Sequence, residues 1–176
     1  CYHNSDLNFL DDVISDSPSA GNNPSQDLDF WKLGYQTWEN DRLTHFCCSN
    51  SDWDLSEYPL ISPLEGSSSS LHPCQTECLN EDGESYELTT LIPESIGNLS
   101  AIDTLALIGM NMLGTMPDTL SSLVALDAFI LAGNENLNGG IPNGMDNISN
   151  LDYLNLQDNG LNGEAPNAIW DMTSLL

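Results

Sequence analysis

The segment LSAIDTLALIGMNMLGTMPDTLSS (99–122) is followed directly by LVALDAFILAGNENLNGGIPNGMDN (123–147) and ISNLDYLNLQDNGLNGEAPNAIWD (148–171). Aligned beneath one another, the three segments show the same order of apolar, asparagine, glycine and proline positions. Their first residues, Leu99, Leu123 and Ile148, are 24 and 25 residues apart, and MTSLL (172–176) opens a fourth copy. A fixed period of this length is typical of repeat architectures, in which each unit stacks on the next.

Each copy carries apolar residues at its positions 1, 4, 7 and 9. The pair at positions 7 and 9 has the period of two that a short strand requires. One such unit cannot bury its own apolar side chains, but stacked units bury them against each other in a continuous core. The residues expected inside the strand layer are Leu105, Leu107, Phe129, Leu131, Leu154 and Leu156.

Position 12 is asparagine in two copies, Asn134 and Asn159, and a glycine and a proline follow in each. This pattern, LxxLxxLxLxxNxLxGxIPxxL, resembles the plant-type leucine-rich repeat. The resemblance implies an α/β solenoid over residues 88–176, about 3.5 repeats, with a parallel β-sheet on the concave face and short 3-10 or irregular segments on the convex side. It also implies that the asparagines point inward and bond backbone groups of the turns. Met110 holds this position in the first copy, so either the turn is locally different there or the ladder of inward asparagines has a gap.

The N-terminal half divides into an acidic segment and linker (1–26) and a cysteine-containing region (27–87). Apolar residues at helical spacing predict a helix over 5–14. A second helix is predicted over 27–38, with Tyr35 and Trp38 on its apolar face. A helix, a tryptophan and a cysteine pair resemble the N-terminal cap that precedes plant-type repeats, which implies a helical cap held by disulfides.

Five cysteines, Cys1, Cys47, Cys48, Cys74 and Cys78, all lie outside the clean repeats. We expect Cys47, Cys48, Cys74 and Cys78 to form disulfides, which fits an extracellular location or another oxidising lumen. The odd number leaves one thiol over, for which Cys1 is the candidate. The alternative is a zinc site drawing on these cysteines together with His45 and His72, although no CxxC pair is present.

The chain is strongly acidic, with 27 acidic against 2 basic residues and a formal net charge of −25. This composition excludes nucleic-acid binding through phosphate neutralisation and disfavours anionic lipid surfaces. No apolar run is long enough to span a membrane, and no signal peptide is visible, so we expect the numbering to start after processing. The C-terminus appears cut within a repeat, which predicts either a further segment or a partner, including a second copy, over the last repeat.

Two sequons are present, Asn98-Leu-Ser and Asn147-Ile-Ser. Both asparagines occupy the residue just before position 1 of a copy. They are therefore predicted to lie two turns apart on one side of the solenoid. We expect both to be glycosylated, which would make that side unsuitable as an interface.

Residues that flank the buried strand leucines are predicted to form the concave surface. Asp103, Asp127 and Asp152 recur at one position, and a basic partner or a bound cation such as Ca²⁺ would relieve their mutual repulsion. The alternative is a solvated acidic edge screened by salt. Next to this column, Ile108, Ala128, Ile130 and Ala132 make the centre of the face apolar, which suggests a protein contact. The predicted binding residues are Asp103, Asp127, Ile130, Asp152, Tyr153, Asn155 and Gln157.

No catalytic pattern is visible, since all three histidines lie outside the repeats and no Ser-His-Asp or phosphate-loop motif occurs. The sequence therefore predicts a non-enzymatic leucine-rich-repeat protein that acts by protein–protein contact, as a structural component of an extracellular or luminal assembly. The alternative is a recognition module, such as a receptor ectodomain or a glycosidase inhibitor, that binds a basic protein on the concave face. No cofactor is predicted beyond calcium at the aspartates, and no regular Thr or Asn column supports ice binding.

Overall fold

The computed structural model describes residues 2–16, 29, 33–49 and 90–170. In this part of the chain a helix is followed by a hairpin and then by alternating strands and 3-10 helices. The elements are α1 (Asn4–Ser15), β1 (Tyr35–Glu39), β2 (Arg42–Ser49), η3 (Glu94–Asn98), β3 (Thr104–Ile108), β4 (Gly114–Thr115), η4 (Asp118–Ser122), β5 (Ala128–Ile130), β6 (Leu137–Asn138), η5 (Met145–Asn147), β7 (Tyr153–Asn155) and α2 (Asn167–Trp170).

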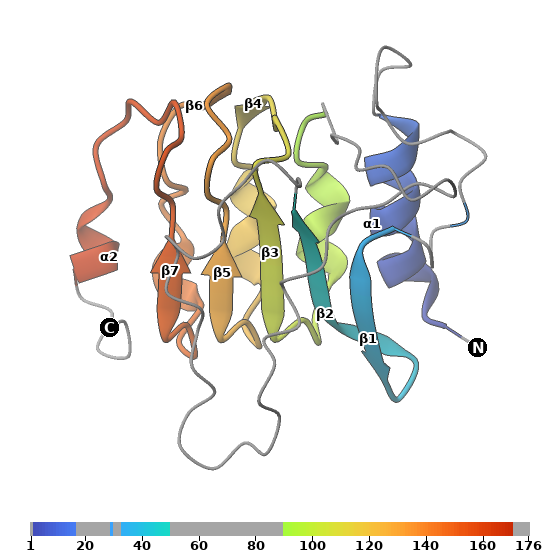
Figure 1. Cartoon of the computed structure of the whole chain (residues 1–176). Helices are drawn as coiled ribbons and strands as arrows, with labels where there is room; N and C mark the ends of the chain where they lie inside the picture. The colour runs from blue at the N-terminus through green and yellow to red at the C-terminus, as the bar shows by residue number, and fades with distance from the viewer. Residues whose placement is uncertain (1, 17–28, 30–32, 50–89, 171–176) are drawn as a thin grey trace, which may run out of the picture.

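The main sheet has five strands in the order β1-β2-β3-β5-β7. The last four strands run parallel, and β1 pairs antiparallel with β2 at the edge. The 3-10 helices lie behind the sheet, and β4 and β6 form a small second sheet along one rim (Figure 1). This is the predicted solenoid arrangement, with a parallel sheet on one side and short helices on the other.

The strand register follows the sequence repeat. Leu105 pairs with Phe129, and Phe129 pairs with Leu154, so residues at position 7 stand side by side on neighbouring strands. Leu105 and Phe129 are fully buried, while Leu154, on the last strand, is half-buried and packs against the same core. The prediction of successive parallel rungs with these residues aligned inside is confirmed.

The predicted asparagine ladder is present from the second copy onward. The fully buried Asn134 accepts hydrogen bonds at Oδ1 from the Met110 and Met112 N–H groups, at 3.0 and 3.1 Å. Its Nδ2 donates to the Leu107 and Ala132 carbonyls, both at 3.0 Å. Asn159 repeats the pattern one rung later, accepting from the Asn134 N–H at 2.9 Å. Met110 is itself buried, so the ladder starts at Asn134.

The helix predicted over 27–38 is wrong at its C-terminal end, because Tyr35–Glu39 forms strand β1. Asn40 and Asp41 have φ values of 49° and 67°, and positive φ at two successive residues is what a tight two-residue hairpin turn needs. Gly34 also has positive φ (60°), and a Cβ there would lie 2.5 Å from the Cys47 carbonyl oxygen. These local backbone requirements override the helical spacing of the aromatic residues.

The N-terminal helix is confirmed as α1, which packs on η3 and covers the first rung (Figure 1). Phe9, Leu10, Val13 and Ile14 are at most 2% exposed and join the same hydrophobic core as the repeats. The Phe9 ring meets the Phe46 ring of β2 edge to face, with centroids 5.7 Å apart. The helix and the hairpin therefore close the core at its N-terminal end.

A buried ion pair fixes α1 to the hairpin. Arg42, the only arginine of the chain, donates to both carboxylate oxygens of the fully buried Asp6, at 2.7 and 2.8 Å. Burial alone would raise the pKa of Asp6, but hydrogen bonds from Arg42, the Leu43 N–H and Ser5 outweigh it, and the pKa lies below its usual value. The pair therefore stabilises the fold at neutral pH and loses this contribution as the pH falls through the lowered pKa.

Replacing Asn134 by alanine is expected to lower the free energy of unfolding by at least about 3 kcal/mol, because buried N–H and C=O groups of two rungs lose their partners. Urea denaturation followed by circular dichroism would measure the change. The matched control is Asn136→Ala, two residues away, since Asn136 is exposed and its amide bonds Asn111. An Asn134→Ala variant as stable as the control would contradict the role of the ladder.

Candidate binding surface

The front face of the sheet is defined here as the side turned away from the 3-10 helices and towards the viewer in Figure 1. It corresponds to the concave face predicted from the sequence. The strand register places one residue of each strand in a single row across this face: Thr37, His45, Thr104, Ala128 and Tyr153. The row shows that the hairpin and the repeats form one continuous surface.

The three aspartates of the predicted column lie beside this row, each just before its strand begins. The backbone aligns them, because the Asp127 N–H donates to the Asp103 carbonyl at 2.8 Å and the Asp152 N–H donates to the Asp127 carbonyl at 2.9 Å. The Asp103 N–H continues the ladder to the Thr44 carbonyl of β2 at 2.7 Å. The side chains are thus held on neighbouring rungs, which lie about 4.8 Å apart in such sheets.

The central carboxylate of the column is destabilised by its surroundings. Its partial burial, and then the neighbouring charges of Asp103 and Asp152, raise the pKa of Asp127 above its usual value. Asp103 is more open, with a side chain that is 51% exposed. The repulsion predicted for the column therefore falls mainly on its middle member.

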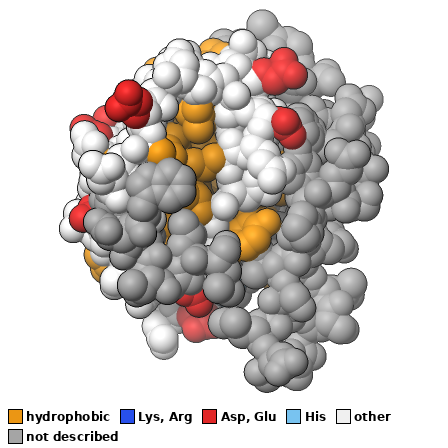
Figure 2. Space-filling view, turned by 90° about the vertical axis from the view of Figure 1, so that its left-hand side faces the viewer, with side chains coloured by type: hydrophobic (Ala, Val, Ile, Leu, Met, Phe, Trp, Pro, Cys, Tyr) orange, Lys and Arg blue, Asp and Glu red, His pale blue; other side chains and the backbone are white. Residues whose placement is uncertain are grey.

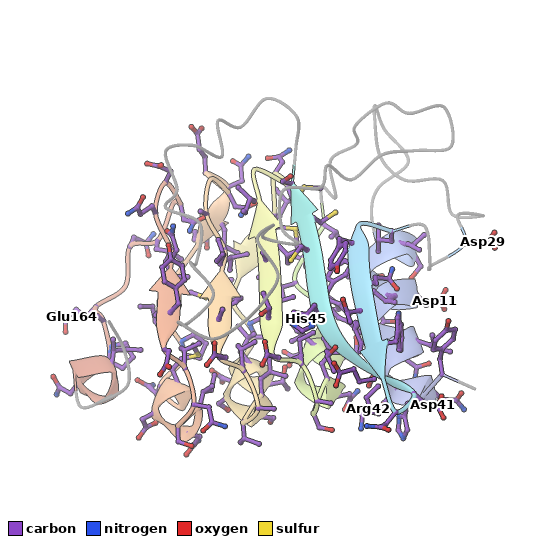
Figure 3. All side chains as sticks on the ribbon, turned by 60° about the horizontal axis from the view of Figure 1, so that its bottom comes forward. Asp11, Asp29, Asp41, Arg42, His45 and Glu164 are labelled. Carbon is purple, nitrogen blue, oxygen red and sulfur yellow. The ribbon has the colours of Figure 1, made fainter. Side chains whose placement is uncertain are left out.

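One side chain that the sequence pattern did not single out for this surface is His45. Its Nε2 lies 3.4 Å from Asp103 Oδ1, and its Nδ1 lies 3.1 Å from the Thr44 hydroxyl. Figure 3 shows His45 on β2, inward from Arg42 and Asp41 at the hairpin end. The prediction missed it because residues 42–49 were not expected to be a strand in register with the repeats. The Asn40-Asp41 turn is the sequence signal that could have indicated this.

The centre of the front face differs from the prediction. Ile130 and Asn155 were expected to contact a partner, but they are only 6% and 5% exposed in this single chain. Ile130 belongs to a separate apolar cluster of the front face, and Asn155 Oδ1 accepts the Gln157 N–H at 3.0 Å, a local structural role. The prediction of an exposed apolar centre is therefore wrong. The side chains of this cluster are already buried: Cys47, Ala106, Ile108, Ile130 and Ala132.

The surface that remains accessible is the edge at which the strands begin. We call it the acidic strip and define it as His45, Asp103, Asp127, Asp152 and Tyr153. His45, Asp127, Asp152 and Tyr153 are half-buried, and Asp103 is exposed. Gln157, also predicted as a binding residue, is exposed but lies beyond the other end of β7. The structure thus brings together four of the seven predicted binding residues.

The acidic strip does not have the geometry of a metal centre. Within the described residues, no three His, Cys, Asp or Glu side chains come close enough to hold a metal ion. The calcium site considered for the three aspartates is therefore not formed in this arrangement. The described helices include none with the length and hydrophobicity needed to cross a membrane.

Replacing Asp127 by asparagine is expected to raise the free energy of unfolding at neutral pH by up to about 1 kcal/mol. The raised pKa of Asp127 means that its ionisation opposes folding, so wild-type stability falls as pH rises through that pKa, and the variant lacks this decline. Denaturation at several pH values and two salt concentrations measures this change in stability, and the control is Asp118→Asn, at an exposed residue of η4. A variant less stable than the wild type at pH 7 would refute the repulsion.

Comparison with known proteins finds a similar sequence in a plant protein. No protein-family model matches the chain. It is 34% identical over 94 residues to Receptor-like protein 6 of Arabidopsis thaliana, an alignment that covers 53% of this chain and 9% of that protein. The chain thus spans only a small part of the relative's length.

The chain is also similar to solved structures of plant proteins. The Arabidopsis receptor kinase HAESA, crystallised with the peptide hormone IDA and the co-receptor SERK1, is 34% identical over 48% of this chain and 14% of its own, with a TM-score of 0.46. A plant ice-binding protein is 20% identical and covers 96% of this chain and 46% of its own, with a TM-score of 0.59, which shows the shared fold. The described repeats resemble plant-type leucine-rich repeats and are similar in sequence to part of a plant receptor-like protein.

Proposed function

We propose that this chain is a non-enzymatic recognition module that binds a protein or peptide carrying basic residues along the acidic strip. The observation that carries the proposal is the row of three aspartates fixed on successive rungs, in which partial burial and then the two neighbouring charges raise the pKa of the middle member, Asp127. A cationic side chain placed between these carboxylates would remove a repulsion that the fold maintains. Binding would therefore gain from charge complementarity.

The described part of the chain offers little internal compensation for this charge. Arg42 is its only arginine or lysine, and it is engaged by Asp6 and the Asn98 carbonyl. His45 is the one side chain of the strip able to carry a positive charge, and it meets only Asp103 among the three aspartates. An external cation is therefore the natural partner for Asp127 and Asp152.

Sequence similarity supports recognition rather than chemistry. The relative that matches over 94 residues is named a receptor-like protein, and HAESA was crystallised with a peptide hormone. We propose the same class of role here, with a protein or peptide ligand and without catalysis. An inhibitor of a glycosidase would use the same surface and belongs to the same proposal.

We further propose an extracellular or luminal location and a cap stapled by disulfides. Cys47 and Cys48 are both disulfide-bonded, and they face opposite sides of β2, in the front-face cluster and the main core respectively. Pairing with Cys74 and Cys78 stays a prediction, because these residues lie outside the described part. The division into 1–26, 27–87 and 88–176 also stays a prediction, and the core shared by α1, the hairpin and the repeats supports a single folded unit.

Binding of an oligolysine peptide, followed by isothermal titration calorimetry at low salt, would test the acidic strip. The triple variant Asp103→Asn, Asp127→Asn, Asp152→Asn is expected to weaken binding at least about tenfold, because three aligned charges are lost. The matched control neutralises three exposed aspartates elsewhere, Asp11, Asp118 and Asp146, and so changes the net charge by the same amount. Equal losses in both variants would show that overall acidity, not the strip, attracts the peptide.

A second candidate function is self-assembly, and the apolar side chains at the β7 end of the solenoid favour it. Figure 2 shows a strip of hydrophobic side chains on the end that carries β7. Ile141, Leu154, Leu156 and Leu161 are only partly buried against the core there. Docking of a second copy on this end would cover them, as the predicted structural role in an assembly requires.

Sedimentation velocity over a range of chain concentrations tests this second candidate. Self-assembly predicts a mass that rises with concentration, and Leu156→Glu should abolish the rise, because a charge would enter the apolar contact. Leu91→Glu is the control, since Leu91 is 57% exposed and lies in the bridge to Leu113, away from β7. A wild-type monomer at all concentrations would leave recognition as the function.

A further inference from the structure

We propose that Asn98 and Asn147 carry N-linked glycans and that the repeat geometry presents both sequons identically. The proposal requires passage through a secretory lumen but does not depend on the acidic strip, so either can fail without the other. It concerns the two motifs that the binding surface does not use, Asn98-Leu-Ser and Asn147-Ile-Ser.

The two asparagines occupy the same structural position. Asn98 is the last residue of η3 and Asn147 is the last residue of η5, and both are exposed. The next residues, Leu99 and Ile148, have nearly the same backbone angles, φ −74° and ψ 58° against φ −83° and ψ 71°. Each is fully buried and anchors the sequon to the core, while the serines at the third position are exposed.

The fold does not need the amides of these two side chains. Among the described residues, the Asn98 and Asn147 amides take no part in hydrogen bonds, and the Asn98 contact with Arg42 uses the backbone carbonyl. By contrast, Asn134, Asn136 and Asn150 each donate from Nδ2 to another group. Attachment of a sugar at Nδ2 would therefore break no contact at either sequon, which distinguishes these sites from the structural asparagines.

The modification is an ordinary group transfer from a lipid-linked oligosaccharide diphosphate. The bond between C1 of the first sugar and the diphosphate oxygen breaks, and a bond from C1 to the asparagine Nδ2 forms. The lipid diphosphate leaves with the bonding electrons, and Nδ2 releases one proton to water. Two glycans would then stand two rungs apart, about 10 Å by strand spacing, on the edge where the 3-10 helices end.

The middle copy provides a matched test of the geometry. Its equivalent position is Ser122, the last residue of η4, followed by the buried Leu123 and the 52% exposed Val124. Leu123 has φ −81° and ψ 58°, as in the natural sequons. Ser122→Asn with Val124→Thr therefore creates a third sequon, Asn-Leu-Thr, in the same backbone conformation.

The experiment is secretion of the full chain from plant cells behind a signal sequence, followed by intact-mass and peptide mass spectrometry before and after a peptide N-glycosidase. We expect two glycans on the wild type, one on Ser100→Ala or Ser149→Ala, and three on the Ser122→Asn, Val124→Thr variant. Asn98→Gln and Asn147→Gln give the same losses by another route, and circular dichroism confirms folding.

Secreted, folded wild type with Asn98 or Asn147 unmodified would overturn the proposal. A third sequon left empty while both natural sites are filled would overturn the claim that the shared conformation presents the sites. Loss of glycans without loss of oligolysine binding would agree with a glycan-bearing edge separate from the acidic strip.

Discussion

The structure depends on pairing the backbone groups at the turns that leave each strand. In a solenoid these groups face inward, where neither water nor a strand ladder can reach them. Asn134 solves the problem with four hydrogen bonds that span two rungs, and Asn159 repeats the solution one rung later. Hydrophobic burial is non-directional, whereas these bonds join particular residues of neighbouring rungs and so reinforce a single register.

A fixed register has a consequence for the surface. Once Leu105, Phe129 and Leu154 are aligned inside, the residues that precede each strand are aligned on neighbouring rungs as well, whatever their charge. Asp103, Asp127 and Asp152 are therefore held close together by backbone hydrogen bonds that do not respond to their repulsion. Partial burial and this repulsion together raise the pKa of Asp127, so the packing of the solenoid determines the electrostatics of its exposed edge.

The sequence predicted the features that repeat and the N-terminal helix α1, but it missed the hairpin. The period, the inward leucines and the aspartate column follow from a pattern seen three times, and the asparagine ladder from one seen twice. The hairpin β1–β2 occurs once, and its Asn40-Asp41 turn was outweighed by aromatic residues at helical spacing. The burial of Ile130 was also unpredictable, because alternation along a strand says which face a side chain takes, not whether that face is open to solvent.

The two kinds of aspartate in this chain show how one residue type serves opposite purposes. Asp6 is fully buried and neutralised by the chain's only arginine, so its charge stabilises the cap. Asp127 is partly buried and lies between two like charges, so its charge opposes folding. Stacked repeats supply the stability that tolerates this opposition. Arg42 is paired with Asp6, and His45 contacts only Asp103 among the three aspartates of the acidic strip. A basic ligand would therefore supply the positive charge that Asp127 and Asp152 lack.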